Sequence, residues 1–149
     1  MIKYRFWSDN KRSDLDITSV NYLLRLLTTK PIRVKKIAEL NKVSENSRLL
    51  LAETDEGNII GMATLAIIRV PTGRFGRIED VVVHDKYRRK GIGKTLTERL
   101  IDEAKKIGLK RIDLTSNPKR VSANLLYKNL GFKSIETNLY RLSLEGDRK

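Results

Sequence analysis

Cysteine is absent from this 149-residue chain, and histidine occurs once, at His84. Without cysteine the chain forms no disulfide, carries no thiolate nucleophile and offers no zinc–thiolate site. A single histidine cannot build a histidine-rich metal cluster, so we expect no bound metal. No apolar run approaches the ~20 residues of a membrane-spanning helix, and the N-terminus lacks the apolar segment of a secretory signal. We therefore expect a soluble, cytoplasmic protein with no membrane partner.

Acidic residues are comparatively few: 18 aspartates and glutamates stand against 31 lysines and arginines, which gives a formal net charge of +13. Such a charge favours an anionic partner, either nucleic acid or a phosphorylated small molecule. The basic residues are scattered in short groups, without the aromatic-rich strand or the recognition helix of a nucleic-acid-binding domain. A nucleic-acid partner is therefore disfavoured.

Hydrophobic periodicity predicts a single mixed α/β domain over residues 1–149, with the element order β-α-α-β-β-β-α-β-α-β-β. The expected strands are short β-branched or alternating runs, at residues 2–7, 48–53, 58–69, 78–83, 112–115 and 140–144. A turn at 54–57 joins two of these strands in a hairpin. Residues 71–76 are expected to form a loop, either a plain connection or a mobile flap.

Helical spacing of apolar residues predicts the helices. They are expected at residues 15–27, 34–40, 95–104 and 123–130. Ser13 is the expected N-cap of the first helix, and Gly131 is the expected C-cap of the last.

The most informative segment joins the strand at 78–83 to the helix at 95–104. It reads Arg88-Arg89-Lys90-Gly91-Ile92-Gly93-Lys94. Its glycines allow the backbone to approach a ligand closely, and the first N–H groups of the following helix are unpaired and attract anions. The basic side chains add positive charge. The segment therefore predicts a pyrophosphate-binding loop.

Spacing excludes two common loops of this kind. A Walker A loop requires glycine at position 88, which is arginine, and the dinucleotide fingerprint requires a third glycine at position 96, which is leucine. The remaining pattern, Arg-x-x-Gly-x-Gly, resembles the acyl-CoA pyrophosphate loop of the GNAT acetyltransferase superfamily.

A second block strengthens this resemblance. Residues 117–132 read Asn-Pro-Lys-Arg-Val-Ser-Ala-Asn-Leu-Leu-Tyr-Lys-Asn-Leu-Gly-Phe, which is similar to the C-terminal acetyl-CoA motif of the same superfamily. The resemblance covers about residues 48–143. It implies an acetyl-CoA-dependent N-acetyltransferase with a central, mostly antiparallel sheet of six or seven strands flanked by four helices.

The resemblance also implies which residues hold acetyl-CoA. Loop residues 88–94 would bind the pyrophosphate, and backbone groups of Val81, Val82 and Val83 would bind the pantetheine arm, with the N–H of Val82 or Val83 polarising the thioester carbonyl. Asn117 and Asn124 match positions that contact the cofactor through their amides. Burial alone also explains the valines, and turn formation also explains Asn117.

Three side chains are candidates for acid–base catalysis. Tyr127 matches the family's helix tyrosine, and a phenol with a pKa of about 10 can protonate a departing thiolate. Its helical spacing equally suits a core residue. Glu79 is the preferred base that takes the proton of the amine, and Asp80 is the second candidate if a bulge shifts the strand register. The two carboxylates could instead attract the cationic amine or pair with Arg77.

The acceptor is open at this stage. Residues 78–87 also resemble the matching strand of glucosamine-6-phosphate N-acetyltransferases, whereas residues 117–120 depart from that family. Other small amines and peptide amines are alternatives, as are a non-catalytic acyl-CoA sensor and a basic nucleic-acid-binding domain. Dimers are common in the superfamily, so a homodimer that pairs through residues 140–144 is a further expectation.

Overall fold

The computed structural model describes residues 1–145. Backbone contacts divide the chain into two compact units, Met1–Thr115 and a second that begins at Ser116, and each is described by itself. Within the described residues, no helix has both the length and the apolar character needed to span a membrane. The expectation that residues 1–149 form a single domain stays a prediction.

The first unit is built on a five-stranded mixed sheet with the order β1-β2-β3-β4-β5. Its strands are β1 (Lys3–Phe6), β2 (Ser47–Glu53), β3 (Ile59–Val70), β4 (Gly73–Val83) and β5 (Ile112–Asp113). Neighbours among the first four strands are antiparallel, and β5 runs parallel to β4. Four helices and this mostly antiparallel sheet give an α/β fold.

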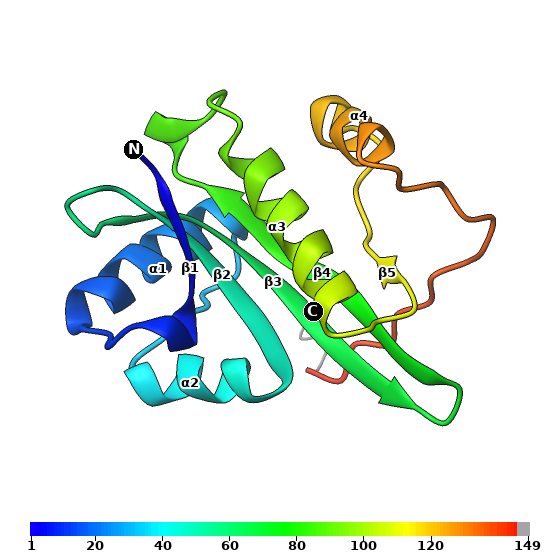
Figure 1. The fold of residues 1–149 in the computed structure, drawn as a ribbon, viewed down its shortest axis with the longest axis horizontal. Helices are drawn as coiled ribbons and strands as arrows, with labels where there is room; N and C mark the ends of the chain where they lie inside the picture. The colour runs from blue at the N-terminus through cyan, green and yellow to red at the C-terminus, as the bar shows by residue number, and fades with distance from the viewer. Residues whose placement is uncertain (146–149) are drawn as a thin grey trace. The chain divides into compact units, whose positions relative to one another are not determined.

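Helices cover both faces of this sheet. Helices α1 (Asp14–Leu27) and α2 (Ile37–Asn46) lie on one face, and α3 (Ile92–Lys106) crosses the other (Figure 1). On the α1–α2 face, Leu51, Met62 and Val82 occupy paired positions on neighbouring strands and join one buried cluster. On the α3 face, Gly61 lets Ile92 and Leu96 pack close to the sheet. Burial of each large apolar side chain contributes about 1.5–3 kcal/mol.

A buried ion pair ties the segment before α1 to the sheet. Arg12 donates to the Glu53 carboxylate at 2.6 Å, and their side chains are only 5% and 6% exposed. Arg12 also donates to the backbone oxygens of Phe6 and Trp7 and lies over the indole ring of Trp7. These partners satisfy a charge that would otherwise be costly to bury.

Several expected elements are confirmed. Ser13 caps α1, with its N–H bound to Asp16 Oδ2 at 2.9 Å. The turn at 54–57 closes through the bond from Gly57 N–H to the Thr54 oxygen, and Gly57 has a φ of 87°. The Ser13 cap and the left-handed Gly57 depend on adjacent residues only, so the sequence alone is sufficient to predict them.

Two expectations in the first unit were wrong. The second helix spans Ile37–Asn46 rather than 34–40, because Val34 is held in the preceding linker by two hydrogen bonds to the Asn21 amide. Residues 71–76 do not form a loop. Strands β3 and β4 continue to a tight turn at 71–72, and Lys110 Nζ donates to the Thr72 oxygen there at 2.6 Å. The plain connection, rather than the mobile flap, is correct.

The second unit contains helix α4 (Val121–Asn129). Gly131 follows it with a φ of 99°, and the N–H groups of Gly131 and Phe132 bind the oxygens of Lys128 and Tyr127. This is a Schellman ending, so the expected C-cap is confirmed.

The strands expected after α4 are a correction. Residues 133–145 form no strand in the described structure, so the sheet has five strands rather than six or seven. Tyr140, Leu142 and Leu144 are 85%, 83% and 88% exposed. An alternating segment forms a strand only where a neighbouring backbone can pair with it. The last strand of the sheet, β5, has only two residues and therefore offers little backbone for pairing. The pairing edge for a homodimer at 140–144 stays a prediction.

Candidate active site

A bulge interrupts β4 at the predicted catalytic residues. Val82 pairs with Met62 and Glu79 pairs with Thr64, so Ala63 alone stands opposite both Asp80 and Val81. Asp80 takes a left-handed φ of 54°, which is uncommon outside glycine but tolerated by aspartate. Such a bulge bends the strand and shifts its alternation. As a result Glu79 and Val82, three residues apart, both face the α1–α2 side.

Beyond the bulge, one edge of β4 is open. Only Gly76 and Arg77 pair with β5, so residues 78–83 have no strand partner on that edge within the described residues. The N–H of His84 points the other way and donates to the Ile60 oxygen of β3 at 2.7 Å. Because backbone groups alternate between edges, the N–H groups of Val81 and Val83 point to the open edge and that of Val82 toward β3. This direction favours Val83 over Val82 as a thioester donor.

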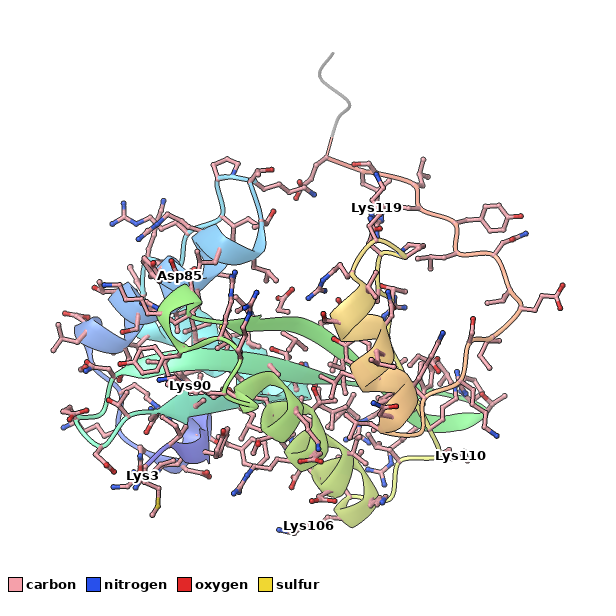
Figure 2. The ribbon with its side chains drawn as sticks, turned by 90° about the horizontal axis from the view of Figure 1, so that it is seen from above. Lys3, Asp85, Lys90, Lys106, Lys110 and Lys119 are labelled. Atoms are coloured by element: carbon pink, nitrogen blue, oxygen red, sulfur yellow. The ribbon has the colours of Figure 1, made fainter. Side chains whose placement is uncertain are left out.

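The loop that follows leads directly into the N-terminus of α3. Arg89 and Gly91 adopt left-handed conformations with φ of 63° and 75°, and Gly91 is the N-cap. The first helical bond that closes runs from Thr95 N–H to the Gly91 oxygen, which leaves the N–H groups of residues 92–94 without a helical partner. Figure 2 shows Lys90 at this end of α3 and Lys106 at the far end. Free N–H groups, the helix dipole and basic side chains are together the features that favour binding of an anion.

The two glycines of this loop serve different purposes. Gly91 is required by its positive φ. Gly93 has an ordinary φ, and an added Cβ would meet only Val83 Cγ2 at an uncrowded 3.8 Å. Nothing inside the protein therefore demands glycine at position 93. Its missing side chain leaves backbone and strand end accessible, which suits the close approach of a ligand.

The two carboxylates of β4 have different surroundings. Glu79 accepts a hydrogen bond from Arg77 Nε at 2.8 Å. The pKa of Asp80 is raised, first by partial burial of its carboxyl group and second by the nearby charge of Glu79. A raised pKa makes a carboxylate a better proton acceptor, which favours Asp80 as the candidate base.

The remaining predicted residues lie in the second unit. Asn117 Oδ1 accepts from Lys119 N–H, and Asn124 Nδ2 donates to the oxygens of Asn117 and Arg120, each at 2.9 Å. Both amides thus hold the turn before α4. Tyr127 lies on α4 and is buried, with its ring edge-on to Phe132 at 5.9 Å.

One cluster was missed from the sequence. No sequence motif assigns a role to His84, yet its ring stacks on Tyr22 of α1 at 4.6 Å and its Nδ1 accepts from Lys86 N–H. Tyr22 O–H donates to Asp85 Oδ1 at 2.8 Å, and Figure 2 shows Asp85 beside α1. The bond to Tyr22 lowers the pKa of Asp85, and the same bond raises the pKa of Tyr22. No local pattern links residues 63 positions apart.

An open strand edge beside a bulge, followed by a glycine-containing loop at a helix N-terminus, is the arrangement expected of an acyl-CoA-dependent acetyltransferase. The match to the family model described as "Acetyltransferase (GNAT) family", over residues 18–132, agrees. The chain belongs to this family and is an acetyl-CoA-dependent N-acetyltransferase.

Individual relatives differ in their acceptors. A glucosamine 6-phosphate N-acetyltransferase of Trypanosoma brucei brucei is 32% identical over 136 residues, which cover 87% of this chain and 90% of the relative. A ribosomal protein bS18-alanine N-acetyltransferase of Escherichia coli K12 is 35% identical over 81 residues, 53% of this chain and 54% of the relative. A Clostridium acetobutylicum acetyltransferase solved with acetyl-CoA superimposes with a TM-score of 0.70 at 25% identity, covering 99% of each chain.

Proposed function

We propose that this acetyltransferase transfers the acetyl group directly from acetyl-CoA to the primary amine of a small acceptor, with Asp80 as the base. The observation that carries the proposal is the β4 bulge. It places a carboxylate of raised pKa next to an open backbone edge, directly before the anion-binding loop. The proposed base and the proposed donor site therefore follow one another along β4 and the loop after it.

The donor would lie along the open edge of β4. Backbone groups of Val81 and Val83 are available for the pantetheine amides, and residues 88–94 and the α3 N-terminus for the pyrophosphate. Arg88 Nε donates to the Val83 oxygen at 3.2 Å, so this arginine must release that oxygen when pantetheine binds there. The unobstructed Gly93 is consistent with such an approach.

The reaction requires a neutral amine. Its nitrogen attacks the thioester carbonyl carbon, the carbon–sulfur bond breaks, and the amine proton passes to Asp80 directly or through water. The Val83 N–H stabilises the developing oxyanion, and Tyr127 donates its phenolic proton to the departing thiolate. Glu79, held by Arg77, adds negative charge that attracts the protonated acceptor before it is deprotonated.

An amino-sugar phosphate is the acceptor we favour. Its phosphate suits a protein of net charge +13, whereas a polycation such as a polyamine would be repelled. The relative that spans most of this chain acts on glucosamine 6-phosphate. An N-terminal alanine amine is the second candidate, on the strength of the shorter match.

Calorimetry and a thiol-release assay test the proposal together. Acetyl-CoA should bind saturably, and thiol release should appear with glucosamine 6-phosphate but not with an alanine-terminated peptide. Release should fall by about 10²-fold or more in Asp80→Asn and should also fall in Tyr127→Phe. It should be retained in the control Asp102→Asn, which changes an exposed residue of α3. Binding without release for any amine would instead indicate an acyl-CoA sensor. Absence of binding would remove the acetyl-CoA site from this loop.

A further inference from the structure

The chain carries a second concentration of positive charge that the acetyl-CoA site does not use. No acidic residue occurs between Asp16 and Glu39. The linker between α1 and α2, residues 28–36, carries the four cations Lys30, Arg33, Lys35 and Lys36. We call this segment the basic linker.

The backbone of the basic linker is held in place. Asn21, only 8% exposed, donates from Nδ2 to the Val34 oxygen and accepts from Val34 N–H, both at 2.8 Å. The Val34 side chain packs against the buried cluster. Because the buried Asn21 amide bonds through both its nitrogen and its oxygen to the backbone of Val34, it fixes the position of that residue. The neighbouring residues Arg33 and Lys35 therefore extend from a backbone whose position is fixed.

The charged side chains of the basic linker face solvent. All four are exposed, and none forms an ion pair with any residue of the described part of the chain. Several other basic residues do have carboxylate partners, namely Arg12, Arg48, Arg77 and Arg111. The Glu39 carboxylate accepts a hydrogen bond from the Lys35 backbone N–H at 3.1 Å and offsets one of the four charges. The remaining excess of positive charge creates a local potential that attracts anions.

The basic linker borders the sheet face that carries Glu79. Glu79 pairs with Thr64, which pairs with Leu49. Leu49 and Val82 belong to the same buried cluster against which Val34 and Ile37 pack. The linker thus lies over the α1–α2 face, on which an acceptor amine would approach the β4 carboxylates.

We propose that the basic linker binds the anionic group of the acceptor, a phosphate monoester, through Arg33 and Lys35. This inference rests on the proposed function and adds the residues that select the acceptor. The Arg33 guanidinium can bind two phosphate oxygens at once, and Lys35 supplies a second charge. Phosphate at the linker and amine at the β4 carboxylates would orient an amino-sugar phosphate at both ends.

The test compares two acceptors that differ only in the phosphate. Steady-state kinetics with glucosamine 6-phosphate and with glucosamine, at saturating acetyl-CoA, are measured for the wild type and for Arg33→Gln/Lys35→Gln. The KM for glucosamine 6-phosphate should rise about 10-fold or more, as expected for lost charged hydrogen bonds. The kcat, the KM for glucosamine and the affinity for acetyl-CoA should change less than about 2-fold.

A matched control separates a specific site from net charge. Lys105→Gln/Lys106→Gln removes the same two charges from the far end of α3, where both side chains are exposed, and should leave the KM for glucosamine 6-phosphate unchanged. Arg33→Lys should recover part of the lost affinity. An equal rise of KM in both double variants, or for both sugars, would overturn the proposal, as would a wild type that prefers unphosphorylated glucosamine.

Failure of the proposed function gives a different result. If neither sugar releases thiol, calorimetric titration of the CoA-bound protein with glucosamine 6-phosphate still decides the linker's role. Binding weakened in Arg33→Gln/Lys35→Gln supports the subsite, and absence of binding to the wild type overturns it. Melting curves of all variants confirm that they are folded.

Discussion

Arg77 and Glu79 form an ion pair on β4, with Arg77 Nε 2.8 Å from Glu79 Oε1 and both side chains on the α1–α2 face. The next residue, Asp80, stands in the bulge, forms no ion pair with any other described residue and has a raised pKa. The ion pair of Glu79 and the raised pKa of Asp80 lead to the first prediction.

Asp80→Asn should lower kcat by about 10²–10⁴-fold, the usual contribution of a general base, whereas Glu79→Gln should lower it less. Because the base must be ionised and its pKa is raised, wild-type activity should fall as the pH drops through a value above the ordinary 3.8. That acid limb should be absent from the residual activity of Asp80→Asn. A larger loss in Glu79→Gln would restore Glu79 as the base.

The same substitution should not destabilise the protein. A raised pKa means that the folded state binds the proton more tightly than the unfolded chain, so this contribution to stability is lost as the pH rises through the folded pKa. Asparagine removes the charge and also tolerates a left-handed φ. At neutral pH the melting temperature of Asp80→Asn should therefore equal or slightly exceed that of the wild type. A clear drop would show that the carboxylate stabilises the bulge.

Gly93→Ala and Gly91→Ala should separate binding from stability. Alanine at 93 has room and an ordinary φ, so the melting temperature should hold while the Kd for acetyl-CoA rises. Alanine at 91 must adopt a φ of 75°, which costs about 1–2 kcal/mol. Calorimetry and urea unfolding measure the two effects. Unchanged acetyl-CoA affinity in Gly93→Ala would argue against close approach of the ligand at this position.

The buried pair of Arg12 and Glu53 should behave as a coupled unit. Removing either side chain leaves the other charge buried without its partner, which costs about 3–5 kcal/mol. Arg12→Ala and Glu53→Ala should each lower the free energy of unfolding in urea by that amount, and the double variant by less than the sum of the two. Additive losses would indicate that the two residues act independently.

Tyr22→Phe removes the hydrogen bond that lowers the pKa of Asp85. The Asp85 pKa should therefore move up toward 3.8, which carboxyl-carbon NMR titration can follow directly. Tyr140→Phe serves as the control, because the Tyr140 hydroxyl accepts a hydrogen bond from Asn138 Nδ2 and is remote in sequence from Asp85. An unchanged Asp85 pKa in Tyr22→Phe would mean that His84 and the backbone, rather than the phenol, determine it.

Local signals in the sequence predicted much of the fold. Ser13 and Gly131 marked helix ends, and the turn at 54–57 marked a hairpin, because caps and turns depend on neighbouring residues only. Long-range partners were not predictable. The Asn21–Val34 bonds displaced the start of α2, and the strand expected at 140–144 depended on a pairing partner that no single segment reveals.

The candidate site also combines features that adjacent residues predict with features that depend on residues distant in the chain. The loop at residues 88–94 could be located from the sequence because its glycines and basic residues are contiguous, and its binding of an anion stays a prediction. The bulge that separates Glu79 from Asp80 could not be located, because it depends on the exact pairing of β4 with β3. Which of the two is the base stays a prediction. The stack of His84 on Tyr22 joins residues distant in the chain, so no motif pointed to it.

The bulge adds one residue to β4 without changing the face that the flanking residues occupy. Thr64 pairs with Glu79 and Met62 with Val82, and Ala63 alone lies opposite both Asp80 and Val81. Deletion of residue 80 would leave Val81 alone opposite Ala63 and restore regular pairing. Glu79 and Val82 would then stand two positions apart and stay on the α1–α2 side, because such residues share a face of a strand. The length of β4 at this point thus determines the local bend of the strand and the presence of the candidate base, rather than the register of the β3–β4 hairpin.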